Sequence, residues 1–164
     1  MARKSENVIR FDFPPERLMQ VLLDPGFQVA RDKANGSLES RVEEKSRTAE
    51  RFVYSMHTKD YARGMTGIDK SKIEDNRADY EWDLKARKAT WTYHPSAQLG
   101  PVKVWGTIKV EADGAGCRLT NTFEVEVKIP LIGGQAEKMV LKEVDKSWPG
   151  FERTIREHHA KLPK

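Results

Sequence analysis

Histidine is the residue type here best suited to acid–base chemistry, because the unperturbed pKa of an imidazole lies near neutrality. His57 and His94 alternate with the apolar residues of their segments, so we expect both to point to the outer face of a sheet. A histidine that pointed inward instead would be the obvious general acid or base. His158 and His159 are neighbours in a helical segment, where adjacent positions do not face each other, so this pair is a poor metal site.

The other residue patterns that carry chemistry are missing from the sequence. Cys117 follows a hairpin glycine, a setting that gives no sign of nucleophilic catalysis. The chain has no HExxH or CxxC pattern, no cluster of spaced carboxylates and no phosphate-binding loop. The sequence therefore predicts no catalytic residue, no metal site and no cofactor.

Aromatic side chains form the most distinctive candidate site. If the strand alternation holds, several of them share one face of a sheet, and two more meet them from the last helix. Small-molecule pockets are mostly apolar with a few polar groups, so this set could bind a flat or greasy ligand. The same residues could instead fill an ordinary core. The predicted ligand-binding residues are Tyr54, Trp82, Trp91, Tyr93, Asn121, Phe123, Trp148 and Phe151.

Asn121 is the one polar member of this set, and it interrupts an otherwise apolar strand face. A buried amide needs hydrogen-bond partners, so Asn121 could orient the polar group of a ligand. A structural role for the amide is the alternative, and the sequence favours it.

Length and composition describe one charged globular domain, residues 1–164, with 38% apolar and 33% charged residues. No apolar run approaches the roughly 18–20 residues that a membrane span needs. The first residues lack the apolar core of a secretory signal, and a single cysteine fits a reducing compartment. We therefore expect a cytoplasmic protein without an integral membrane segment. Its oligomeric state does not follow from the sequence.

The net charge of +4 comes from the second half of the chain. Residues 1–82 carry 15 basic and 15 acidic side chains, whereas the remainder carries 14 basic and 10 acidic ones. A basic patch would suit nucleic acid or an anionic lipid surface. Acidic residues are interspersed throughout, however, and no nucleic-acid-binding motif is present. The sequence favours an ordinary solvated surface and predicts no nucleic-acid partner.

The order of elements is a strand, two short helices, a run of strands and a long helix. Alternation predicts a first strand over residues 7–13, and Pro15 can open the first helix. A second helix is expected over 26–33, strands follow from Leu38, and residues 113–116 form a hairpin turn. Residues 60–75 fit either a strand or a loose connection. The last helix is expected over 135–162, with a kink or break at Pro149-Gly150.

An apolar hinge separates the last strand from the last helix. Pro130 ends the ladder of the strand, and Gly133 and Gly134 permit backbone conformations that other residues avoid. We expect Leu131 and Ile132 to anchor the base of the helix by packing against the protein.

This order of elements resembles the helix-grip fold of the START-like, birch-pollen-allergen-like superfamily, also called SRPBCC. The segments most similar to it are "FPPERLMQVLLDPGF" (13–27) and "GCRLTNTFEVEVKIPLIGGQAEKMV" (116–140), the second with an IP-x-x-G hinge typical of an uncharacterised bacterial branch. The resemblance implies an α+β fold in which a curved antiparallel sheet wraps around the long C-terminal helix. It also implies a space for a ligand between sheet and helix.

Three functions are compatible with this resemblance. The first is the binding or transport of a hydrophobic small molecule, such as a lipid or a polyketide. The second is an enzyme of the cyclase or aromatase type that uses the same cavity. The third is a protein-interaction module with a vestigial cavity. The absence of a convincing acid–base pair in the sequence favours a binding protein over an enzyme, without deciding the question.

Overall fold

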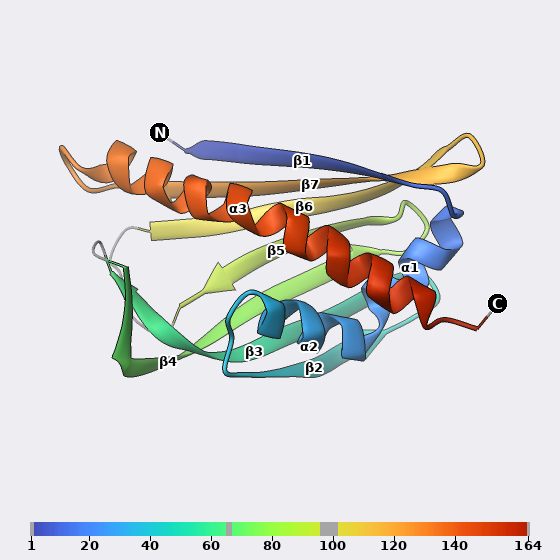
Figure 1. The fold of residues 1–164 in the computed structure, drawn as a ribbon, viewed down its shortest axis with the longest axis horizontal. Coiled ribbons are helices and arrows are strands. Elements are labelled where there is room, and N and C mark those ends of the chain that lie inside the picture. The colour runs from blue at the N-terminus through green and yellow to red at the C-terminus, as the bar shows by residue number, and fades with distance from the viewer. Residues whose placement is uncertain (1, 65–66, 96–101, 164) are drawn as a thin grey trace.

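A computed structural model describes residues 2–64, 67–95 and 102–163 (Figure 1). Along the chain the elements are β1 (Arg3–Phe11), α1 (Pro15–Leu23), α2 (Pro25–Ala34), β2 (Glu39–Arg47), β3 (Arg51–Gly64), β4 (Gly67–Asp83), β5 (Lys88–His94), β6 (Val102–Asp113), β7 (Gly116–Val127) and α3 (Gly133–Ala160). All seven described strands belong to one antiparallel sheet. The predicted α+β architecture, with two short helices after the first strand and a long C-terminal helix, is confirmed.

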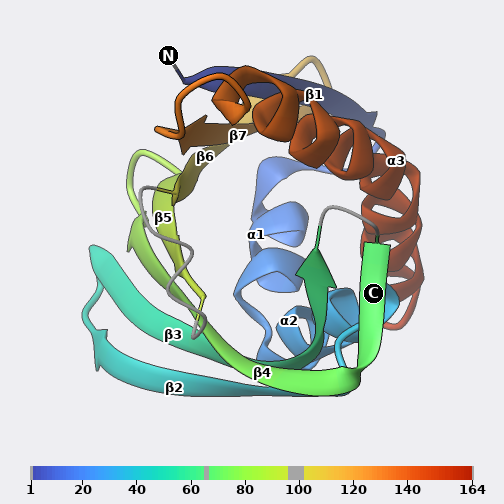
Figure 2. The ribbon, with the colours of Figure 1, turned by 90° about the vertical axis from the view of Figure 1, so that its left-hand side faces the viewer.

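The strand order is β1-β7-β6-β5-β4-β3-β2, so the first strand lies beside the last one. The sheet curves around the helices, with α3 on the side of β1 and β7 and α2 on the side of β2 and β3 (Figures 1 and 2). The main contacts of α3 are with β1, β7, α1 and α2. The helix therefore rests on one flank of the curved sheet.

The two short helices follow from simple local signals. Pro15 occupies the first turn of α1, where its missing N–H costs nothing, and α1 buries an apolar face that includes Leu18 and Leu22. Asp24 then caps α2, because its carboxylate accepts a hydrogen bond of 3.1 Å from the backbone N–H of Gly26. Together these helices close one end of the curved sheet.

The uncertain segment 60–75 is strand at both ends. It belongs to the long β3–β4 hairpin, in which Lys59 pairs with Asp75 and Gly64 with Gly67. The turn predicted over 113–116 is confirmed, and Gly114 has the positive φ of 59° that such a turn requires. Strand alternation is thus a good guide through the sheet.

Gly106 of β6 is needed for close packing on the inner face of the sheet. It lies opposite Trp91 of β5 and opposite Phe123 of β7. A Cβ atom here would lie 2.4 Å from the Trp91 ring and 2.2 Å from the carbonyl oxygen of Thr122. Only glycine lets the indole lie across the strand pair.

The last helix and its hinge differ from the prediction in three ways. The helix continues through Pro149, which excludes the break but not the kink, the other expectation. The left-handed backbone of the hinge is at Leu131, with φ of 71°, and not at Gly133 or Gly134. Leu131 is fully exposed and Ile132 is exposed, so they do not anchor the helix base. Glu137 does that instead: its side chain is buried, and its Oε2 accepts a hydrogen bond of 2.8 Å from the backbone N–H of Val127.

Candidate ligand-binding site

The strand register brings the predicted aromatic residues onto the inner face of the sheet. Tyr54 lies opposite Tyr80, and Tyr80 lies opposite Trp91. Their ring centroids are 5.0 Å and 6.3 Å apart, and the Trp91 ring lies 5.5 Å from that of Phe123 across Gly106. A row of four rings therefore crosses the sheet from β3 to β7, an arrangement suited to stacking against a flat molecule. Tyr80 belongs to this row, although it is not among the residues predicted for the site.

The row is covered unevenly. Tyr54 and Trp82 are fully buried, and Phe151 of α3 is buried with them. Trp91, Tyr93, Phe123 and Trp148 are only partly buried, although the register or the contacts of each direct it inward. The eight predicted residues thus share one interior, in which one half is sealed and the other half remains accessible.

Two amides face each other in the accessible half. Asn121 is inward-facing and only 4% exposed, and it lies directly opposite Asn7 of β1. Within the described residues, neither the Asn121 Nδ2 donor nor the Asn7 Oδ1 acceptor has a hydrogen-bond partner, and both atoms are buried. An unpaired buried polar group lowers the stability of a protein by about 1–3 kcal/mol, so two of them side by side suggest a missing partner. The two amides offer one donor to a carbonyl group and one acceptor to a hydroxyl group.

A hydrogen-bonded triad holds α3 beside these amides. The Ser5 hydroxyl donates to Asp145 Oδ1 at 2.5 Å and accepts a hydrogen bond of 3.3 Å from Trp148 Nε1. Trp148 also lies next to Phe151, with ring centroids 6.2 Å apart. The contact fixes the middle of α3 on β1, and no sequence signal indicates it because Ser5 and Asp145 are far apart in the chain.

A second polar group lies at the sealed end of the row. The Arg31 guanidinium of α2 lies 5.4 Å from the centre of the Tyr80 ring and 3.2 Å from Asp32 Oδ1, and Asp32 accepts a hydrogen bond from Ser40. Burial raises the pKa of the Tyr54 hydroxyl, and it raises the pKa of Tyr80 as well. Both phenols are therefore neutral at physiological pH and act as hydrogen-bond donors or acceptors. The only sequence signal for this group is a weak one, an adjacent Arg-Asp pair in a short helix.

His57 and His94 lie outside this interior, whereas His158 and His159 of α3 pack against the buried rings of Phe27 and Phe13 at its sealed end. The expectation that His57 and His94 face outward is confirmed: His57 Nε2 is 3.0 Å from Glu43, and His94 Nε2 is 3.2 Å from Asp79. His159 stacks on Phe13 at 3.7 Å and accepts a hydrogen bond of 2.9 Å from Arg17 Nε. These contacts give the imidazoles structural roles.

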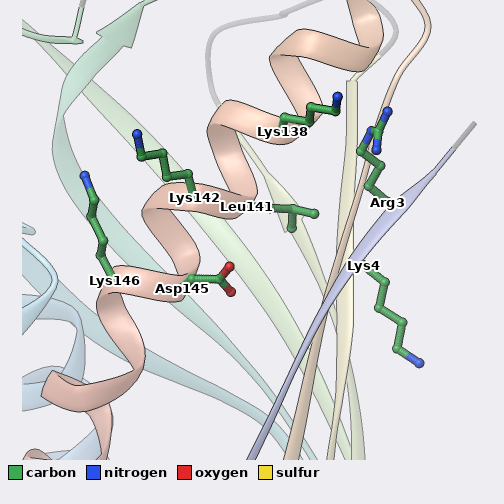
Figure 3. Close-up of a pocket in the computed structure, with 7 residues that line it drawn as sticks. All are labelled: Arg3, Lys4, Lys138, Leu141, Lys142, Asp145 and Lys146. Carbon is green, nitrogen blue, oxygen red and sulfur yellow. The ribbon is translucent and has the colours of Figure 1, made fainter.

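Two surface grooves lie apart from the aromatic row, and none of the eight predicted residues lines either of them. One, of about 720 Å³, lies near Thr58, Asn76 and His94. The other, of about 540 Å³, lies between β1 and α3 and has Leu141 and Asp145 on its wall (Figure 3). Five basic side chains surround this second groove, which we call the basic groove: Arg3, Lys4, Lys138, Lys142 and Lys146.

In the part of the chain that the structure describes, no three His, Cys, Asp or Glu side chains are grouped to hold a metal ion. No described helix is long and apolar enough to cross a membrane.

Comparison with solved structures supports the helix-grip fold. The Zhui aromatase/cyclase from Streptomyces sp. R1128 is similar with a TM-score of 0.66 and 14% identity, over 99% of this chain and 97% of that one. Ara h 8.0201 is similar with a TM-score of 0.65 and 12% identity, over 99% and 100% of the two chains. TTHA0849 from Thermus thermophilus has a TM-score of 0.60 and 19% identity, over 98% and 97%. At these identities the likeness concerns the fold alone.

Comparison with curated proteins finds no match. Residues 6–158, which include the aromatic row, both amides and most of α3, match the model of a family described as Protein of unknown function (DUF2505), and the chain belongs to that family.

Proposed function

We propose that this protein binds a hydrophobic small molecule between α3 and the inner face of the sheet, in the accessible half of the interior. The observation that carries the proposal is that Asn7 Oδ1 and Asn121 Nδ2 are buried without a hydrogen-bond partner among the described residues, beside aromatic rings that are inward-facing but partly uncovered. A finished core would cover such rings and pair such amides.

The arrangement suits a ligand with a flat apolar body and one neutral polar group. The body would stack on Trp91 and Phe123, whose rings are 5.5 Å apart and tilted by 54°. The Asn121 Nδ2 group would donate to a carbonyl of the ligand, and the Asn7 Oδ1 atom would accept from a hydroxyl. Trp148 would close the site from the helix side, where Ser5 already holds its indole N–H.

A fluorescence titration with an environment-sensitive fluorescent fatty acid tests the proposal. We expect saturable binding that Phe123→Ala weakens, because this change removes one stacking ring from the accessible half. Val8→Ala, an exposed position on the outer side of β1, is the matched control and should bind as wild type does. No binding of any apolar probe to the wild-type protein would refute the proposal.

A cyclase-type enzyme is the second candidate, and the partly buried Arg31 beside Tyr80 is the observation that favours it. A guanidinium and a neutral phenol can together stabilise the negative charge of an enolate as a reactive chain folds. This candidate predicts that the protein changes the products formed from a poly-β-ketone thioester and that Tyr80→Phe abolishes the change. A pure binding protein would return the same products as the uncatalysed reaction.

A further inference from the structure

The loop before α3 holds apolar side chains out in the solvent. Leu131 is fully exposed, and its φ of 71° is a backbone conformation that leucine rarely adopts. Ile132 beside it is also exposed, as is Met139 in the first part of the helix. We call Leu131 and Ile132 the apolar tip. A strained backbone that displays a leucine to water does not serve the packing of the free protein.

The basic groove follows directly after the apolar tip along the chain. Lys138, Lys142 and Lys146 recur every four residues and therefore lie along one side of α3 (Figure 3). Among the described residues, Lys138 and Lys142 form no ion pair, whereas Lys146 pairs with Glu143. Positive charge therefore dominates this side of the helix.

The carboxylates near the groove offset this charge only in part. Glu137 is only 2% exposed and pairs with Arg3, and the exposed carboxylate of Glu143 pairs with Lys146 at 3.3 Å. Asp145 is exposed and accepts a hydrogen bond from the neutral Ser5 hydroxyl, which leaves its negative charge in place. Lys138 and Lys142 therefore leave one positive charge in excess on the groove wall, beside exposed apolar groups.

The β3–β4 hairpin reaches the same end of the molecule as the start of α3 (Figures 1 and 2). Ile68 and Ile73 of β4 are exposed there, and the residues between them include the exposed Lys70 and Lys72 as well as the exposed Asp69. Exposed apolar side chains therefore occur on two separate segments at one end, whereas the basic excess belongs to α3.

We propose that this end of the protein docks on the surface of an anionic lipid bilayer. The apolar tip enters the boundary between headgroups and acyl chains, while the lysines of the basic groove bind lipid phosphates. Exposed leucine and isoleucine gain nothing from the phosphate backbone of a nucleic acid, which favours a bilayer over DNA or RNA. The docking does not depend on the ligand site inside the protein.

Co-sedimentation with vesicles tests the proposal directly. Wild-type protein should bind vesicles of equal parts phosphatidylcholine and phosphatidylglycerol, should bind pure phosphatidylcholine far more weakly, and should be released by salt. Lys138→Glu/Lys142→Glu should lower the partition coefficient by about tenfold or more. The control Lys88→Glu/Lys161→Glu makes the same change of charge at the opposite end of the molecule and should bind as wild type does.

A second pair of variants tests the apolar tip. Leu131→Ser/Ile132→Ser should lower the partition coefficient roughly tenfold, because it removes the side chains that would leave water. Val8→Ser/Leu38→Ser changes two other exposed apolar residues and should have no effect. If the serine pair bound as tightly as wild type while the glutamate pair did not, the attraction would be electrostatic only and the proposal would be wrong.

A spectroscopic label distinguishes insertion from contact. Cys117 is buried, so a cysteine introduced by Leu131→Cys can be labelled selectively with an environment-sensitive fluorophore. We expect its emission to shift to the blue with anionic vesicles, whereas the same label at Val8→Cys should not shift. Absence of a shift, equal binding to neutral and anionic vesicles, or binding to duplex DNA that the serine pair leaves unchanged would each overturn the proposal.

Discussion

The two halves of the interior differ in how completely they are packed. At the end closed by α1 and α2, Trp82, Tyr54 and Phe27 are fully buried and surrounded by other apolar side chains. Under the first half of α3, inward-facing rings remain partly uncovered. Asn7 Oδ1 and Asn121 Nδ2 lack hydrogen-bond partners there within the described residues, and at the closed end Gln28 Oε1 also lacks one. The sealed half supplies the burial that keeps the fold stable, and this lets the other half stay incomplete.

The position of α3 causes this difference. The helix contacts β1 and β7, but the two short helices meet it only in its second half. There the ring centroids of Phe27 and Phe151 are 6.1 Å apart. In Figure 1, α1 and α2 lie beside the second half of α3 and not beside its first half. One fold can therefore hold a core and a binding site side by side.

The largest expected effect is the loss of stability when a tryptophan in one half or the other is replaced by alanine. Trp82→Ala should destabilise the protein by about 3–5 kcal/mol, because it empties a fully packed position. Trp91→Ala should cost only about 1–2 kcal/mol, because its ring is already partly solvated. Urea denaturation of both variants measures the two free energies of unfolding. Equal losses would show that the halves are packed alike.

Trp148 reports on the boundary between the halves. It is partly buried, and its indole N–H donates to Ser5. We expect Trp148→Ala to lower the free energy of unfolding by about 2–3 kcal/mol, a loss between those of the other two variants. A loss below about 1 kcal/mol would place the side chain in solvent or in an open site.

The next effect concerns the start of α3, where two adjacent glycines should behave differently. A Cβ atom at Gly133 would lie 2.2 Å from the carbonyl oxygen of Val127, so Gly133→Ala should cost about 1–3 kcal/mol by pushing the helix off β7. At Gly134 the nearest atom is the far end of Arg3 at 3.6 Å, so Gly134→Ala should be neutral or stabilise by about 0.4–1 kcal/mol. Thermal melts of the two variants decide this.

The packing of Gly133 also bears on where α3 could lift from the sheet to admit a ligand. Gly133 serves close packing against β7, so the point that could open lies beyond it, where Glu137 binds Val127 N–H. We predict that Glu137→Gln speeds the association of a fluorescent fatty acid in stopped-flow experiments, because it weakens this attachment. Unchanged rates would mean that α3 does not move when the ligand enters.

A further prediction uses the opposite demands that stability and binding place on Asn121. Asn121→Leu removes an unpaired buried donor, so it should stabilise the protein by about 1 kcal/mol. The same change should weaken binding of a ligand that carries a carbonyl group, because the donor is gone. Asn121→Asp, which keeps the shape of the side chain but buries a charge, should lower both the stability of the protein and its affinity for the ligand. If Asn121→Leu destabilised the protein, the amide would be structural.

The fold follows from the sequence because strand alternation is local. The period of two correctly places Trp91 and Tyr93 on the inner face, with Thr90, Thr92 and His94 on the other. The hairpin at Gly114 and the two short helices also depend only on neighbouring residues. Asn121 interrupts an apolar face in the sequence, and this local signal identifies the residue that is buried without a partner for its donor among the described residues.

What could not be predicted depends on contacts between distant segments. Asn7 becomes part of the site only because β1 pairs with β7 in the register that sets it opposite Asn121. In the helical pattern Glu137 looks like an ordinary surface residue, and only the folded chain brings it to the backbone N–H of Val127 at the end of β7. The apolar character of Leu131 predicts inward packing, but the left-handed turn of the hinge directs the side chain outward.

The smallest effect concerns pH and the sealed half. Burial and the neighbouring Arg17 lower the pKa of His159 from its usual value of 6.5, because both disfavour the protonated ring. The folded pKa lies below the unfolded one, so the unfolded chain binds the proton more readily. The contribution of the neutral ring to stability is complete above about pH 6.5 and is lost as the pH falls through the folded pKa.

His159→Phe keeps the stack on Phe13 and should abolish this part of the pH dependence, whereas His94→Phe on the outer face should leave it intact. Urea denaturation between pH 7 and about pH 5 measures it. A variant His159→Phe that lost stability as steeply as wild type would show that another group is responsible.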